Sequence, residues 1–156
     1  MSFALSGRSL SKLEGVHPDL VAVVKKAIEL TKIDFGVIAG TRTVSEQEKN
    51  VAAGRSQTMN SKHLPQNDGY SHAVDLMAYV GGQGVWELNV YDEVCDAMAE
   101  AADEFGVPIK WGAAWSEGSI GDYSGSAEEA MNAYIDLRRS EGRRPFIDAP
   151  HYEMIT

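Results

Sequence analysis

The sequence is poor in cysteine, in long apolar runs and in positive charge. Its single cysteine, Cys95, has no second cysteine to pair with, which excludes an internal disulfide. No apolar run reaches the roughly 20 residues of a membrane-spanning helix, so membrane insertion is not expected. The opening residues 1–8 lack a basic stretch followed by an apolar one, and they therefore predict no export signal peptide.

The shortage of basic residues argues against a nucleic-acid partner. Lysine and arginine total 14, against 23 aspartates and glutamates, which gives a net charge of −9 with neutral histidines. A phosphate-binding surface needs clustered Lys and Arg side chains. The two small basic clusters, at 25–26 and 138–144, fall in helical patterns that are typical of solvated faces. The same charge balance provides no electrostatic attraction to anionic membranes.

Length and composition predict a single soluble domain. A chain of 156 residues can enclose a sizeable core, and hydrophobic and charged fractions of 44% and 24% are ordinary for a globular protein. Because there is no internal repeat, low-complexity tract or long linker, we expect one domain over residues 1–156. We expect it to act as a monomer. Cys95 recurs at helical spacing with Tyr91, Val94 and Met98, which favours a buried position over a reactive thiol.

Hydrophobic periodicity predicts a mixture of helices and short strands. Apolar residues at spacings of three and four, together with two capping boxes (Ser45 with Glu48, Ser126 with Glu129), predict helices. The expected helices lie at 17–30, 45–54, 87–105 and 126–141, and the expected strands at 35–40, 72–80, 107–111 and 151–155. The stretches 54–71 and 112–125 are predicted to be loops. We therefore expect an α+β fold with a small, mainly antiparallel sheet and flanking helices.

Asp75 is the most informative single residue, because it lies in the apolar run 73–78. A carboxylate is costly to bury unless it is paired or binds a metal. A salt bridge to a core arginine or an exposed edge position would also account for it. A metal ligand or catalytic carboxylate accounts for the position better.

A second informative group is the segment 148–153. Pro150 interrupts regular hydrogen bonding just before an expected strand, on which His151 and Glu153 share one face. Asp148 lies three residues before His151, in a turn from which it can reach over the same site. The segment suits a metal-binding histidine with a general base nearby.

Of the four histidines, His17 precedes Pro18 at a helix start and is interpreted as structural, which leaves His63, His72 and His151 as candidate ligands. A hydrolytic zinc ion takes three protein ligands and keeps one position for water. His63, Asp75 and His151 would supply two nitrogens and one oxygen, a set suited to one Zn²⁺ ion. Asp148 would then serve as general base, and Arg42, just after the strand ending at Gly40, would bind a substrate carboxylate or the developing oxyanion.

These residues resemble the M15 family of zinc peptidases, and within it the phage endolysin branch. The family's motif Ser-x-His, followed by Ala-x-Asp, matches Ser61-Lys62-His63 and Ala73-Val74-Asp75. Its downstream acid-x-x-His motif matches residues 148–151. Further matches are the Gly-x-Arg-Thr segment at 40–43, the Trp-Gly turn at 111–115 and the opening Val-His-Pro-Asp-Leu at 16–20.

The resemblance implies a LAS-type metallopeptidase fold, similar to hedgehog and D-Ala-D-Ala peptidases. It implies a zinc-dependent peptidoglycan hydrolase that lyses the host of a bacteriophage by cutting cell-wall stem peptides, most specifically the L-alanyl-D-glutamate bond. Zinc-bound water would attack, and Asp148 would accept its proton. Thr43, Gln47 and Ser61 are further candidates for substrate contacts. Synthesis in the host cytoplasm and action in the periplasm would follow.

Two alternatives remain open from the sequence. One is a VanY-like D-alanyl-D-alanine carboxypeptidase of the same family, with the same zinc chemistry and a different pocket. The other is a non-catalytic, zinc-containing wall-binding module, against which the retained Asp148 argues because a structural site needs no base.

The chain departs from the family motif between His63 and Asp75, which are 75 − 63 = 12 positions apart and thus further than in the motif. The insertion lies within 64–71. It is rich in turn-forming residues and is expected to bulge outward, to narrow the cleft or to present Tyr70 to substrate. It also brings in a rival ligand, His72. Since His72 and Asp75 point to opposite faces of a strand, His72 is expected to be packed or to support the site indirectly.

Overall fold

Antiparallel strands form one sheet in the computed structural model, which describes residues 3–55 and 59–155. The strand order is β1-β2-β5-β4, and β3 pairs with the far end of β2. The central strand β2 thus contacts β1 along one edge and both β5 and β3 along the other. The strands are β1 (Asp34–Ala39), β2 (Ala73–Val80), β3 (Gln83–Val85), β4 (Ile109–Trp111) and β5 (His151–Met154).

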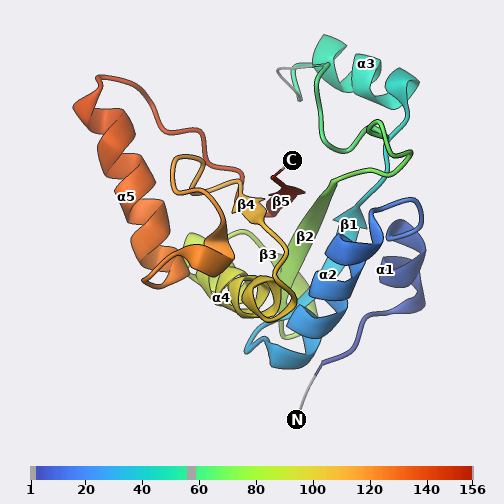
Figure 1. Ribbon diagram of the computed structural model, residues 1–156, viewed down its shortest axis with the longest axis horizontal. Helices are drawn as coiled ribbons and strands as arrows, with labels where there is room; N and C mark the ends of the chain where they lie inside the picture. The colour runs from blue at the N-terminus through green and yellow to red at the C-terminus, as the bar shows by residue number, and fades with distance from the viewer. Residues whose placement is uncertain (1–2, 56–58, 156) are drawn as a thin grey trace.

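Helices cover one face of this sheet and flank its ends (Figure 1). They are α1 (Gly7–Lys12), α2 (Pro18–Leu30), α3 (Val44–Ala52), α4 (Leu88–Phe105) and α5 (Ala127–Ser140), with a short 3₁₀ helix at Ile120–Asp122. The two helices α2 and α4 pack against each other, α1 packs on β1, and α5 packs on α4. Helices α3 and α5 stand on opposite sides of β5, the last strand (Figure 1).

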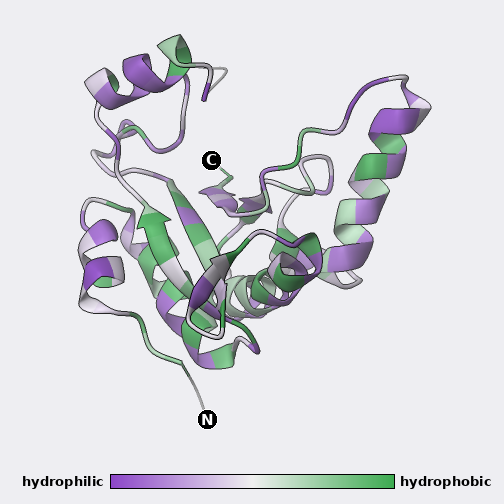
Figure 2. Ribbon diagram, turned by 180° about the vertical axis from the view of Figure 1, so that it is seen from behind, coloured by the Kyte–Doolittle hydropathy of each residue, from purple (hydrophilic) through white to green (hydrophobic). Residues whose placement is uncertain are grey.

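The hydrophobic core lies between the sheet and the helix pair α2–α4. Side chains of β2 alternate, so that Val74, Leu76 and Ala78 are buried in the core while Asp75 lies on the opposite, less covered face. Figure 2 shows hydrophobic residues concentrated in the strands and α4, whereas α3 is largely hydrophilic. Cys95 is fully buried on α4, as its helical spacing predicted.

The α+β prediction is confirmed, with boundaries close to those expected for α2, α4 and α5. Helix α4 ends at Gly106, whose φ of 65° is a left-handed conformation that glycine adopts without a steric penalty. The capping box Ser126–Glu129 is present at the start of α5. The short elements α1 and β3 were not predicted, because six and three residues are too few to show a periodic pattern.

The predicted capping box of Ser45 with Glu48 is wrong. Helix α3 begins two residues earlier, with Thr43 as N-cap: its hydroxyl accepts a hydrogen bond from the backbone of Glu46, whose carboxylate accepts one from the backbone of Thr43. Both pairs fit the same Ser/Thr-x-x-Glu pattern, so the local sequence does not discriminate between them. In the structure only the earlier pair forms a capping box, and the four residues 40–43 connect β1 to α3.

Within the described ranges, no helix combines the length and the apolarity that crossing a membrane requires.

Candidate functional site

The register of three strands brings the site together. Asp75 on β2 lies opposite His151 on β5 and opposite Ala39 on β1. The β1–β2 ladder shifts register between Val37 and Ala39, a bulge of the kind that re-aims the chain next to functional sites. The end of β1 and the start of β5 therefore flank the same carboxylate.

Two histidines converge on that carboxylate. Nε2 of His63 lies 3.3 Å from Oδ1 of Asp75, and Nδ1 of His151 lies 3.1 Å from the same oxygen. The two imidazole rings meet edge to face, with centroids 5.2 Å apart. For a tetrahedral ion with bonds of 2.0–2.2 Å, neighbouring ligand atoms are about 3.4 Å apart. The three side chains thus have the spacing that a shared metal ion requires.

The outward nitrogens of both histidines are held by acceptors. Nδ1 of His63 lies 2.8 Å from the carbonyl oxygen of Gly40, and Nε2 of His151 lies 2.8 Å from a carboxylate oxygen of Glu153. A metal ion needs neutral rings, and with the proton of each ring on its outward nitrogen, the lone pair of the other nitrogen is free to bind the ion. Without a metal, that inner nitrogen carries a proton when it donates to Asp75. Such outer acceptors orient metal-binding histidines and fix their tautomers.

The charges of the cluster favour a bound cation. Burial alone would raise the pKa of Asp75, but hydrogen bonds from His151 and His63 outweigh it and hold that pKa well below its usual range. Burial lowers the pKa of His151, yet Asp75 and Glu153 raise it to about 9. The carboxylates therefore stabilise positive charge at this point, which either a proton or a metal ion can provide.

Asp148 lies in a tight turn beside the cluster. Its backbone N–H donates to the carbonyl of Gly112 (2.8 Å), and its own carbonyl accepts from the N–H of His151 (3.0 Å). Gly112 completes the arrangement by donating to the carbonyl of His151 (2.8 Å). Burial, and then the charge of Asp75, raise the pKa of the Asp148 carboxyl, so this group is a better proton acceptor than an ordinary aspartate.

Arg42 is held next to the cluster by hydrogen bonds to His63 and Gln47. Its backbone N–H donates to the carbonyl of His63 (2.9 Å), and its guanidinium donates to Oε1 of Gln47 (2.7 Å). Its charge acts on Asp148, whose pKa it lowers in opposition to burial. Gln47 is fully buried on α3, so the interaction ties the guanidinium to a fixed point of the fold.

The remaining candidates for substrate contacts have structural partners. Thr43 caps α3, and Gln47 holds Arg42. The hydroxyl of Ser61 accepts a hydrogen bond from the backbone N–H of His63 (3.2 Å). Each of the three therefore positions the polypeptide around Arg42 or His63.

The insertion between His63 and Asp75 forms a closed loop that leaves these two candidate ligands side by side. Pro65 and Ser71 form an antiparallel bridge, and the backbone N–H of Gln66 donates to the carbonyl of Tyr70 (2.8 Å). The Tyr70 ring packs against His17, with centroids 5.6 Å apart. The loop thus bulges outward, and its aromatic ring contacts His17, the N-cap residue of α2, rather than His63 or His151.

His72, which immediately precedes β2, has Asp68 and not Asp75 as its side-chain partner, in agreement with the expectation that the two side chains point to opposite faces. Its Nε2 lies 2.8 Å from a carboxylate oxygen of Asp68, within the inserted loop. His17, interpreted from the sequence as structural, caps α2 by accepting a hydrogen bond from the backbone N–H of Asp19.

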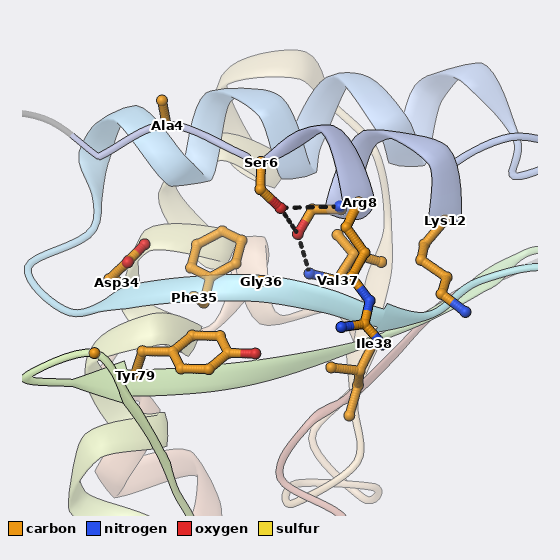
Figure 3. A pocket seen from close by; sticks show the side chains of 12 residues that line it. Ala4, Ser6, Arg8, Lys12, Asp34, Phe35, Gly36, Val37, Ile38 and Tyr79 are labelled. Carbon is orange, nitrogen blue, oxygen red and sulfur yellow. Dashed lines mark hydrogen bonds between the residues drawn. The ribbon is translucent and has the colours of Figure 1, made fainter.

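Two pockets differ in how near they lie to the cluster of His63, Asp75 and His151. One, of about 400 Å³ between α1 and β1 (Figure 3), is lined by Arg8, Lys12 and Asp34 among others, and shares no residue with the cluster. The backbone N–H of Val37 on β1 donates a hydrogen bond to the hydroxyl of Ser9 on α1, which joins the two elements there. A second, of about 420 Å³, is lined by Trp115, whose ring lies 5.6 Å from that of His151. Trp115 thus links this pocket to the cluster, although none of His63, Asp75 and His151 lines it.

Two histidines and one aspartate, of which Asp75 and His151 lie on the antiparallel sheet, have the donor atoms that suit a metal-dependent hydrolase, and Asp148 lies beside them. Comparison with known proteins agrees. The family model described as phage L-alanyl-D-glutamate peptidase matches residues 1–155. The chain therefore belongs to that family, and it is a peptidase.

Two relatives support the assignment. The L-alanyl-D-glutamate peptidase of Escherichia phage T5 is 33% identical over 127 residues, which cover 79% of this chain and 88% of that protein. The crystal structure of the Serratia marcescens L-Ala D-Glu endopeptidase ChiX matches with a TM-score of 0.70 at 29% identity, covering 99% of this chain and 91% of that one.

Two groups were missed as parts of the site. The Gly40 carbonyl carries no signal in the sequence, because every residue has one. Glu153 was placed on the same face as His151, a signal that predicted its proximity but not its contact.

Proposed function

We propose that this chain is a zinc-dependent peptidoglycan hydrolase that cleaves the L-alanyl-D-glutamate bond of stem peptides, with His63, Asp75 and His151 as the ligands of one zinc ion. The observation that carries the proposal is the convergence of both histidines on one oxygen of Asp75, with their outward nitrogens already held by Gly40 and Glu153. Two imidazole nitrogens and one carboxylate oxygen suit zinc.

A bound zinc ion would supply a Lewis acid that polarises the scissile carbonyl and lowers the pKa of water. Asp148 is proposed to accept the proton of the attacking water and then to pass it to the leaving amine. Its raised pKa and its turn beside His151 support this role.

Arg42 is proposed to bind a substrate carboxylate or the developing oxyanion. Its guanidinium is oriented by the buried Gln47, so part of the entropy of immobilising the side chain is already lost before substrate binds. A stem peptide contains free carboxylates next to the proposed scissile bond, and arginine recognises carboxylates through paired hydrogen bonds. In this proposal Gln47, Thr43 and Ser61 position the catalytic groups.

The substrate is proposed to lie between α3 and α5, because Arg42 precedes α3 while the pocket beside Trp115 is lined by residues of α5. Both named relatives act, by their names, on the L-alanyl-D-glutamate bond. They favour this bond over the D-alanyl-D-alanine alternative. We further propose that residues 1–156 act as a single catalytic domain and a monomer, made in the host cytoplasm and active on the wall in the periplasm.

Mass spectrometry of sacculus digests tests metal and bond together. Purified sacculi are incubated with the protein as prepared, with the protein after chelation, and with the chelated protein resupplied with Zn²⁺. We expect fragments with a new amino-terminal D-glutamate in the first and third digests and none in the second. Release of free D-alanine instead would assign the carboxypeptidase activity, and full activity after verified removal of metal would exclude the zinc mechanism.

A further inference from the structure

A second group of two histidines and one aspartate lies outside the proposed catalytic centre. His17, Asp68 and His72 each direct one donor atom into a common region. Nε2 of His72 lies 2.8 Å, and Nε2 of His17 lies 3.8 Å, from the same oxygen of Asp68. These distances bracket the spacing of about 3.4 Å between neighbouring ligands of a tetrahedral zinc ion.

We propose that His17, Asp68 and His72 form a second site for a divalent transition-metal ion, for which Zn²⁺ is the probe. The donor set matches that of the catalytic group, with two imidazole nitrogens and one carboxylate oxygen. The His72 side chain is 7% exposed, that of His17 24% and that of Asp68 40%. The buried imidazole fixes the site in the fold, and the exposed carboxylate gives an ion access from solvent.

The proton positions are compatible with metal binding. In the metal-free protein Nδ1 of His17 accepts a hydrogen bond from the Asp19 backbone, so a neutral ring carries its proton on Nε2, facing Asp68. Metal binding at Nε2 requires that proton to move to Nδ1, which breaks the capping hydrogen bond from the Asp19 backbone N–H. The Asp19 carboxylate lies 4.0 Å from Nδ1, so a movement of its side chain by about 1 Å would let it accept a hydrogen bond from that N–H, as carboxylates do for metal-bound histidines.

The site would join three segments at one point. His17 starts α2, Asp68 belongs to the inserted loop, and His72 immediately precedes β2. The loop begins next to His63, so an ion here would anchor the segment that carries a catalytic ligand without touching the reaction. The backbone contacts of His17 with Ser71 (2.9 Å) and of His72 with Lys62 (2.8 Å) already bring these segments together.

Metal stoichiometry in a set of four proteins tests the proposal. Asp68→Asn keeps an oxygen for the backbone N–H of Tyr70 but loses the charged ligand, and Asp75→Asn disables the catalytic centre. By elemental analysis after Zn²⁺ loading and desalting, we expect two equivalents in the wild type, one in each single variant and none in the double variant. Asp68→Asn should still digest sacculi, whereas Asp75→Asn should not.

The measurement distinguishes an error in the second-site proposal from an error in the catalytic-site proposal. If the wild type and Asp68→Asn both bind one equivalent, the second site is refuted while the catalytic proposal stands; if Asp75→Asn binds as much zinc as the wild type, the catalytic ligand set is wrong. As a second measurement, Zn²⁺ should raise the Tm of Asp75→Asn by several degrees. His17→Asn in the Asp75→Asn background, which retains a capping side chain, should abolish that rise, and an undiminished rise would overturn the proposal.

Discussion

Nδ1 of His151 and Oδ1 of Asp75 lie 3.1 Å apart across neighbouring strands, although 76 positions separate the two residues in the chain. The contact exists because β2 and β5 pair with these two residues directly opposite each other. The same carboxylate oxygen faces His63 from the loop before β2. One aspartate thus orients both histidines of the proposed metal centre.

Replacing Asp148 with Asn should abolish lysis without removing the metal. The amide has the shape of the carboxylate but cannot accept the proton of the attacking water, and general base catalysis is worth about 10²–10⁴-fold in rate. Turnover is measured on purified sacculi, and zinc content by elemental analysis. A variant that digests sacculi at the wild-type rate would exclude Asp148 as the base.

Glu153→Gln should weaken metal binding while the fold is retained. Glu153 holds Nε2 of His151 at 2.8 Å, and loss of such an outer partner costs about 10–100-fold in metal affinity. Competition with a chromophoric chelator measures the affinity. Glu100→Gln, at an exposed position of α4, is the matched control and should bind zinc as the wild type does. Equal affinities in both variants would show that Glu153 does not support the ligand.

Arg42→Lys should lower kcat/KM by about 10–100-fold with little change in stability. Lysine retains the charge but cannot make the paired hydrogen bonds that a guanidinium offers to a carboxylate, and it loses the geometry of the contact with Gln47. Steady-state kinetics on a soluble stem peptide measures the effect. Arg55→Lys, at an exposed position after α3, should change nothing. If both substitutions are silent, the cleavage does not depend on Arg42.

Gly112→Ala should both destabilise the protein and impair activity. A Cβ at this position would lie 2.2 Å from the carbonyl oxygen of Asp148 and 3.0 Å from Cβ of His151, so the turn carrying both residues must shift. Overpacking of this kind costs about 1–3 kcal/mol. Thermal unfolding and sacculus digestion report the two effects. Gly7→Ala meets no atom within 4 Å and is the control; an unchanged Tm and rate for Gly112→Ala would contradict the role of this contact.

Asp92→Asn should stabilise the protein at pH 7 and alter its pH dependence. Burial, and then the charges of Glu128, Asp96 and Glu93, raise the pKa of this α4 carboxyl to about 6, and its Oδ1 has no hydrogen-bond partner among the described residues. The unfolded chain, with a pKa near 4, loses its proton first as the pH rises. The wild type therefore loses stability between about pH 4 and pH 6, and the penalty persists above pH 6.

After allowance for solvent screening at the edge of the core, we expect Asn to stabilise the protein at pH 7 by about 1 kcal/mol. Urea unfolding at pH 4.5 and pH 7 measures the difference from the wild type, which should grow with pH. Asp103→Asn, exposed on the same helix, should show no such trend. A difference for Asp92→Asn that does not change with pH would refute the assignment.

The helices and most strands were predictable because their signals are local. The stripe that includes Leu20 and Val24 defines α2, Gly106 ends α4, and the Ser126–Glu129 box starts α5. Where two local signals competed, as at the start of α3, the sequence did not decide between Thr43 and Ser45, since both have glutamate three residues later.

The sequence by itself determined which residue types were available for chemistry: a carboxylate in an apolar strand, a histidine after Pro150, and an acid three residues before it. The tertiary structure decided how they meet. Strand order and register place Asp75 against His151, the β1 bulge brings the Gly40 carbonyl to His63, and the inserted loop brings Asp68 to His17 and His72. Local sequence records propensities within a few residues, whereas contacts between distant segments depend on how the whole sheet and its helices bury their apolar faces.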